Sequence, residues 1–508
     1  MASLVFLSAQ KVVCDHTSLR QALDFVPKEL YPVLFKAAFL GKRTLVLQDL
    51  VHQWPFPILS FQKLLQRDGS CNPSQIQEKP SRLSIQTVIL GVMAYLGDML
   101  NAAGPERKQR LRLLDMTGIP DDVLKQGPDT MSLWARTVSL AKACIDISKR
   151  HCCEATQAAK RRRSHAERTQ EAGVSGNSAY VEVRVDIFVN STSYSVLREA
   201  LMVSSYGPLR LQCRDLRAEE LSLRSTMALL KLLRPMAVRQ VDLRFNNLGL
   251  EGLNVLLPYM SKFSSLQSVK LPYSNIDIRR LSPQMEEAMK KFSSLIGQLT
   301  SLKELNLGSS RLSGRLAQLL GGLQHPLESL ELAFCYLLPA DCVYLSRSIH
   351  VSSLKKLDFS GNNLSELLLS PFQELLTNIS SSLLHLDIME CKLCDSALST
   401  LVPALCRCFR LRYLGLSDNP FSSQGLKTLL HKCLHLQDLQ MVVYPFPVDC
   451  YINDLPDWPA NDPFMDPQKV AQISTELEEM LVKAQRTDTV WTTDMHLHRS
   501  LDYLNLQQ

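Results

Sequence analysis

Residues 354–364 read LKKLDFSGNNL, and this stretch decides the fold. It follows the pattern L-x-x-L-x-L-x-x-N-x-L, with Phe359 in the third apolar position, which is the strand-and-turn half of a leucine-rich repeat. Seven further copies give start-to-start steps of 28, 36, 25, 27, 29, 28 and 25 residues. They begin at Val238, Leu266, Leu302, Leu327, Leu383, Leu411 and, least regularly, Leu436. Eight copies at a near-constant period predict a stack of repeats.

Each repeat is predicted to contribute a short strand, a turn and a helix. The apolar residues of the strand alternate, so they point into the core while the residues between them line a concave face. Asn246, Asn362 and Asn419 share the position after the strand, where a buried amide can bond backbone groups of the turn and of the neighbouring repeat. Cys335 and Cys391 fill the same position. Because one repeat cannot bury its own core, the predicted fold is an α/β leucine-rich repeat horseshoe.

Composition narrows the class of protein. The chain has 508 residues, a net charge of +6, 45% hydrophobic residues and 14 cysteines without the spacing of a disulfide framework. Such a mild charge does not favour a nucleic-acid partner. No signal peptide is evident, and the longest apolar run, residues 88–96, is too short to span a bilayer. We therefore expect a cytoplasmic protein without a membrane segment, monomeric outside its complexes.

Periodicity divides the chain into five segments. These are an N-terminal helical cap (1–105), a capping repeat with a helix over 131–149 (106–150), a disordered basic loop (151–179), the repeat array (180–445) and a C-terminal cap (446–508). In the N-terminal cap, Thr17 or Ser18 is expected to cap a short helix, and 44–54 and 84–100 are expected to form amphipathic helices.

Several stretches closely resemble the PRAME-like family along nearly the whole chain. They include LYPVLFKAAF (30–39), VHQWPFPILSFQKLL (51–65), LLDMTG (113–118), DLRFNNLGLEGL (242–253), PLESLELAFC (326–335) and YPFPVDCY (444–451). The resemblance implies a ribonuclease-inhibitor-like horseshoe that binds proteins and needs no cofactor. It further implies two sets of partners: elongin C and cullin 2 of a ubiquitin ligase, and the IKK beta kinase subunit, whose binding would restrain NF-κB signalling below Toll-like receptors.

The elongin hypothesis can be compared with individual residues. A BC-box-type helix begins with a small or hydroxyl residue and Leu, which Ser18 and Leu19 match, but Leu23 stands where Cys is expected. Trp54 lies between helix-breaking residues, so it is either an exposed adaptor contact or a rigid corner that packs the cap, and we favour the corner. The adaptor-docking candidates are therefore Ser18, Leu19, Leu23 and Trp54.

The concave face is the natural surface for a protein target. Its central strand positions are predicted to be Asp242, Lys270, Asn306, Glu331, Asp358, Asp387, Gly415 and Gln440. Four of these residues are acidic, which disfavours nucleic acid. Phe245, Tyr273, Phe334 and Tyr413 are candidate aromatic anchors nearby. For a single residue the alternative of a plain solvent-facing position remains open. The paired reversal Asp358→Lys with Asp387→Lys is expected to weaken binding without unfolding the chain.

No known catalytic or metal-binding motif is found. The KRRR run at 160–163 is either a solvated loop or a nuclear import signal that adds a nuclear fraction. Cys391 and Cys394 form a lone C-x-x-C, for which core packing is the better explanation than metal. The functional hypotheses are a stoichiometric blocker of IKK beta that uses only the horseshoe, and a ubiquitin-ligase substrate receptor that also needs residues near 18–60. An enzyme is the least favoured class.

Overall fold

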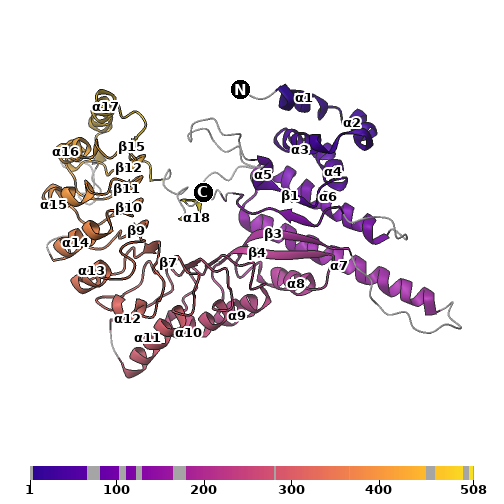
Figure 1. Ribbon diagram of the computed structural model, residues 1–508, viewed down its shortest axis with the longest axis horizontal. Coiled ribbons are helices and arrows are strands. Elements are labelled where there is room, and N and C mark those ends of the chain that lie inside the picture. Colours follow the sequence, from indigo (N-terminus) through magenta and orange to yellow (C-terminus); the bar gives the residue numbers. More distant parts are fainter. Residues whose placement is uncertain are drawn as a thin grey trace. The chain divides into compact units, whose positions relative to one another are not determined.

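The computed structural model describes residues 4–65, 81–101, 110–119, 121, 129–163, 179–279, 282–364, 367–452, 464–495 and 503–506. Its internal contacts divide the chain into two compact units, Met1–Arg239 and Gln240–Gln508. In each unit, parallel strands alternate with helices along the chain (Figure 1).

The second unit is a run of leucine-rich repeats whose strands pair in parallel, each with the next. The strands are β5 (Gln240–Asp242), β6 (Ser268–Lys270), β7 (Glu304–Asn306), β8 (Ser329–Glu331), β9 (Lys356–Asp358), β10 (His385–Asp387), β11 (Tyr413–Gly415), β12 (Met441–Val443) and β15 (Val490–Thr492). Their middle residues from Val241 to Val442 are fully buried, because they face the helices. This is the core that the repeat pattern predicts.

Helices cover one side of these strands, on the outside of the arc that unit 2 makes by itself (Figure 1). They are α10 (Gly249–Met260), α11 (Pro283–Ile296), α12 (Leu316–Leu320), α13 (Pro339–Ser346), α14 (Leu369–Ile379), α15 (Asp395–Leu405), α16 (Ser423–Cys433) and α17 (Pro467–Lys483). The short helix α18 (Tyr503–Leu506) lies on the inner side of the arc instead (Figure 1). Between α16 and α17 lie η3 (Val448–Cys450) and the antiparallel pair β13 (Tyr451–Ile452) and β14 (Phe464–Met465).

Buried amides join successive repeats, as the sequence predicts. The Asn362 side chain donates to the carbonyls of Phe359 and Leu332, both 2.9 Å away, and accepts from the Leu337 N–H at 3.1 Å. Asn419 makes the equivalent bonds in the repeat that follows Cys391. Its side-chain oxygen accepts a hydrogen bond from the Cys391 N–H at 3.0 Å. The Cys391 thiol is buried and bonds to the Phe359 carbonyl, so this cysteine belongs to the core.

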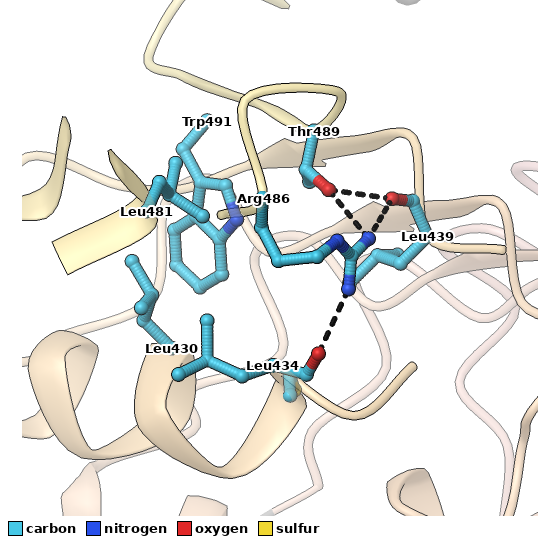
Figure 2. Close-up of a pocket in the computed structure, with 8 residues that line it drawn as sticks. Leu430, Leu434, Leu439, Leu481, Arg486, Thr489 and Trp491 are labelled. Carbon is cyan, nitrogen blue, oxygen red and sulfur yellow. Dashed lines mark hydrogen bonds between the residues drawn. The ribbon is translucent and has the colours of Figure 1, made fainter. Parts of the chain in front are cut away.

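The last repeat is held by Arg486, a buried arginine in the turn after α17 (Figure 2). Its guanidinium donates to the carbonyls of Leu434, Leu436 and Leu439, each 2.9 Å away. The Thr489 hydroxyl also donates to the Leu439 carbonyl, and Trp491 lies beside the aliphatic stem (Figure 2). These bonds satisfy the carbonyls that a next repeat would otherwise meet.

The first unit starts with helices and continues into a short parallel sheet in the order β1-β2-β3-β4. Its elements are α1 (Leu4–Val12), α2 (His16–Ala22), η1 (Leu23–Phe25), η2 (Lys28–Leu30), α3 (Tyr31–Leu40), α4 (Thr44–His52), β1 (Ile58–Ser60), α5 (Phe61–Leu65), α6 (Arg82–Asn101), β2 (Leu113–Asp115), α7 (Leu133–Arg163), β3 (Val181–Val189), α8 (Tyr194–Ser204), β4 (Leu209–Ala218) and α9 (Leu223–Leu232). Helix α6 is long and apolar enough over residues 82–100 to cross a membrane, and half of that window is buried in the structure. One such helix is by itself weak evidence for a membrane span.

Four local predictions were wrong. Asp15, rather than Thr17 or Ser18, caps α2, because its carboxylate reaches the Ser18 N–H at 3.1 Å. Helix α7 continues to Arg163, so disorder was wrongly predicted for residues 151–163; no Gly or Pro interrupts that stretch. Residues 164–178 of the predicted loop lie outside the described residues. A strand, β1, occurs inside the predicted helical cap and pairs with β2.

The fourth correction concerns the register of the last repeat. Leu414 pairs with Val442 and Gly415 with Val443, so the repeat begins at Leu439 rather than Leu436. Val443 therefore holds the position predicted for Gln440. The step from Leu411 then becomes 28 residues, the same as the step before it.

Candidate protein-binding surfaces

Each three-residue strand of unit 2 turns its first and third side chains away from the helices, which makes two rows across the sheet. The third-position row runs through Asp242, Lys270, Asn306, Glu331, Asp358, Asp387, Gly415 and Val443. Strands lie about 4.8 Å apart, so long side chains in neighbouring positions can bond one another. The two rows form a dense polar network.

Charged side chains in these rows are paired along the sheet. Lys270 lies 3.6 Å from the Glu304 carboxylate, and Lys356 lies 3.0 Å from that of Glu331. The Asn306 amide donates to Glu331 at 2.6 Å. Burial raises the pKa of Asp358 to about 7, and the neighbouring charges of Asp387 and Glu331 add to the shift.

The network continues into the His385 ring. Its Nε2 lies 2.7 Å from an Asp387 carboxylate oxygen, and the ring stacks on Tyr413 with centroids 4.1 Å apart. All three residues are buried.

Three of the predicted contact residues are therefore not available to a partner. Asp242, Asp387 and Tyr413 are each no more than 2% exposed, because neighbouring side chains cover them, whereas Glu331 and Asp358 are half-buried. A lysine at position 387 would meet a buried site, so we now expect the double reversal to destabilise the fold rather than leave it intact.

Exposed aromatic residues gather instead at the edge where the strands end. Phe245, Tyr273 and Phe334 are 47%, 52% and 39% exposed. Each stands three residues after a third-position residue, and the Phe245 and Tyr273 rings stack with centroids 4.6 Å apart. We call these three residues the aromatic ledge. The structure thus supports the surface exposure of the predicted aromatic anchors other than Tyr413.

The backbone does not require aromatic residues at the ledge. Phe245, Tyr273 and Phe334 have φ of 59°, 57° and 55°, a left-handed conformation that bulky residues rarely adopt. In other repeats the same position holds Ser309, Gly361, Glu390 and Asp418, also at positive φ. Bulky rings in this strained, solvent-facing place therefore point to a role in contact with other molecules.

Tyr336 extends the ledge and was not predicted. It is 61% exposed, has φ of 53° and follows Cys335, the residue in the buried turn position. The residue after that position faces solvent in each repeat with this turn, as Asn247 does. The pattern N-x-L could have identified Tyr336, because the first and third residues of this pattern point inward and only the middle residue points outward.

The predicted adaptor-docking residues lie mostly in the core of unit 1. Leu19, Leu23 and Trp54 are 4% exposed or less, and Ser18, which is exposed, bonds to Asp15. The Trp54 indole N–H donates to the Ile58 carbonyl at 3.1 Å, and its ring meets Phe35 edge-on. Trp54 is thus the rigid corner, and in this conformation these three buried side chains cannot contact an adaptor.

Stacked strand–turn–helix units with buried turn amides define the chain as a leucine-rich repeat protein. The PRAME C-terminal domain matches residues 200–499, and the PRAME N-terminal domain matches residues 2–70. Leucine-rich repeat-containing protein 14 of Xenopus laevis is 64% identical and that of Homo sapiens 47% identical, each over 100% of both chains. The chain belongs to the PRAME family.

Among solved structures, the yeast complex of Rad7 and Elc1 contains a chain with 14% identity and a TM-score of 0.40, covering 86% of this chain and 88% of that chain.

Proposed function

We propose that this chain is a non-enzymatic protein-binding scaffold that binds the IKK beta kinase subunit and thereby restrains Toll-like receptor and NF-κB signalling. The resemblance to the PRAME-like family suggests this partner and this pathway. We place the action in the cytoplasm, with a nuclear fraction if the basic run at 160–163 is read by an import receptor.

The observation that best supports protein binding is the aromatic ledge. Aromatic side chains are enriched at protein interfaces because each buries a large area at a small cost in side-chain entropy. Phe245 and Tyr273 are already held against each other, so little further ordering is needed when a partner covers them. The buried charge network beneath them gives the ledge a rigid base.

The test is capture of purified IKK beta by the full chain and by the double variant Phe245→Ser, Tyr273→Ser. Loss of the two stacked aromatic side chains is expected to weaken binding at least ten-fold. The matched control is Phe409→Ser, since Phe409 is 62% exposed but follows α15 in the helical layer. Equal affinity of the double variant and the unaltered chain would move the binding surface away from the ledge.

A second candidate function is that of a substrate receptor in a cullin 2–elongin ubiquitin ligase. The specific observation is a set of apolar side chains exposed on the first elements of unit 1: Leu4, Leu7, Val12 and Phe25. Phe25 is 87% exposed, and Leu4 and Leu7 are one turn apart on α1. Apolar residues grouped in this way favour a protein partner.

Point substitutions test this function better than a truncation of residues 1–60, which would remove β1 and Trp54 and so damage the core. The double variant Leu4→Glu, Leu7→Glu is expected to lose elongin C in affinity purification while keeping IKK beta. Leu367→Glu, at an 81% exposed leucine of unit 2, is the control. If elongin C is never recovered, or is recovered equally with the double variant, the receptor function is contradicted.

A further inference from the structure

The C-terminal segment returns to the middle of the repeat array. Strand β15 ends at Thr492 beside β12, yet the hydroxyl of Tyr503 in α18 donates to the Glu328 carboxylate, just before β8, at 2.7 Å. Five strand spacings separate β15 from β8, about 24 Å. Eleven residue steps can span about 36 Å, which is longer than this distance.

Two side chains of this segment are buried. Tyr503 is fully buried, and Leu504 is 3% exposed. They also lie beyond residue 499, where the match to the PRAME C-terminal domain stops. The repeat array is complete without them, so their burial is an added contact rather than part of the repeat.

Tyr503 meets a charged rim. Lys303, Glu328 and Lys355 immediately precede β7, β8 and β9, and because these strands are parallel their starts share one edge of the sheet. The Glu328 carboxylate lies 3.2 Å from the Lys303 ammonium and 2.5 Å from that of Lys355. This edge is opposite to the aromatic ledge, which follows the strand ends.

The surroundings of Glu328 make its carboxylate a good acceptor of a hydrogen bond from a hydroxyl group. Burial would raise its pKa, but hydrogen bonds from Lys355, Tyr503 and Lys303 outweigh burial and lower the pKa to about 2. The carboxylate is thus ionised at neutral pH and can only accept hydrogen bonds. A phenol O–H is a strong donor to such an oxygen, and a phenylalanine in its place would leave that bond unmade.

We propose that the rim of Lys303, Glu328 and Lys355 is a binding site for a tyrosine–aliphatic segment of a partner protein, and that the chain's own Tyr503 and Leu504 occupy it in the free protein. The proposal deepens the proposed function, because it assumes that the array binds proteins. A partner carrying such a segment displaces the tail, so the tail sets a threshold for binding.

The test uses the full chain and a labelled peptide with the sequence of residues 499–508, RSLDYLNLQQ. Binding is measured by fluorescence anisotropy to the unaltered chain and to the variant Tyr503→Ala, Leu504→Ser, in which the tail is released. A tethered tail competes at high effective concentration, so the released variant is expected to bind the peptide at least ten-fold more tightly. A peptide with Phe for Tyr503 is expected to bind that variant roughly ten-fold more weakly.

The controls separate the rim from general effects. Adding Glu328→Gln to the released variant is expected to reduce peptide binding, whereas adding Glu476→Gln, which alters an ion pair with Lys427 on α16 and α17, is expected to leave it unchanged. In the unaltered chain, excess peptide is expected to speed amide hydrogen exchange of residues 503–506, a readout that does not depend on the released variant being stable.

Equal peptide binding by the released and unaltered chains, or no binding and no change in exchange, would overturn the proposal. IKK beta is absent from these measurements. A negative result in the peptide experiment therefore leaves the scaffold proposal standing. A failure to capture IKK beta likewise leaves peptide exchange at the rim measurable.

Discussion

Asp358 shows the electrostatic cost of placing several carboxylates next to one another in one row of the sheet. Its neighbours in register are Glu331 and Asp387, so three carboxylates stand side by side. Lys356 is paired with Glu331, and His385 with Asp387, whereas Asp358 accepts from the Ser360 N–H at 3.0 Å. Burial and two like charges therefore hold its pKa near 7.

This shift predicts a pH dependence of stability. The pKa of Asp358 is raised from 3.8 when unfolded to about 7 when folded, so between these values the folded chain binds more protons. The contribution of Asp358 is fully present below pH 3.8 and is lost as the pH rises through 7. We expect Asp358→Asn to stabilise the chain at pH 8 by roughly 1 kcal/mol or more.

Urea unfolding of both chains at pH 5 and pH 8 measures the effect. The stabilisation by Asp358→Asn should be larger at pH 8, while Asp438→Asn, at an exposed position, should change stability equally at both values. A gain that does not depend on pH would show that Asp358 is ionised in both states.

For single residues, the sequence predicts the side chains that the repeat pattern itself requires. It does not predict the burial that side chains of adjacent strands cause. The turn amides of Asn362 and Asn419 were predicted because their position requires backbone bonds. The burial of Asp242, Asp387 and Tyr413 was not, because alternation gives the side of the sheet but not the cover supplied by adjacent strands.

Phe334 and Gly361 show how the aromatic ledge depends on the turns that hold it. A Cβ built on Gly361 would lie 2.2 Å from the Phe334 ring, and the glycine has φ of +70°. The Phe334 ring can therefore lie across the next turn only because residue 361 has no side chain. This fixes Phe334 in the ledge.

We expect Gly361→Ala to destabilise the chain and to weaken IKK beta binding, because it adds a clash to an unfavourable backbone conformation. Gly249→Ala is the matched control: its φ is +60°, but its nearest neighbour would be 4.0 Å away. Thermal unfolding should show about 1 kcal/mol for the control and at least 1 kcal/mol more for Gly361→Ala. Equal losses would show that the ring moves aside at no cost.

Elements were predicted well where the repeat is regular. Every strand from β5 to β11 follows from the apolar pattern, and the inserted helix α11 follows from the 36-residue step. Strand β1 was missed because three residues between a Pro-rich corner and a helix carry no readable period. The last repeat was misplaced because Leu436 and Leu439 both fit an apolar position, and only pairing with β11 decides between them.

Each of the two units has its own buried stabilising group of residues. At the start, Tyr31, Phe35, Phe39, Trp54 and Phe61 form a buried aromatic cluster beside β1. At the other end, Arg486 satisfies the carbonyls of the last repeat. In a solenoid each repeat contacts only its neighbours, so damage at one end should spread along the chain over a limited distance.

Nearest-neighbour coupling predicts separate local effects for Trp54→Ala and Arg486→Met. Removing a buried indole is expected to cost about 3–5 kcal/mol, and removing the guanidinium leaves buried carbonyls without donors. Hydrogen exchange with mass spectrometry should show faster exchange near 58–61 and 113–115 for the first variant, and near 434–443 for the second, with strand β6, which lies away from the Tyr503 contact, unchanged in both. Faster exchange throughout the chain in either variant would mean that the two units unfold as one, and that nearest-neighbour coupling does not describe this protein.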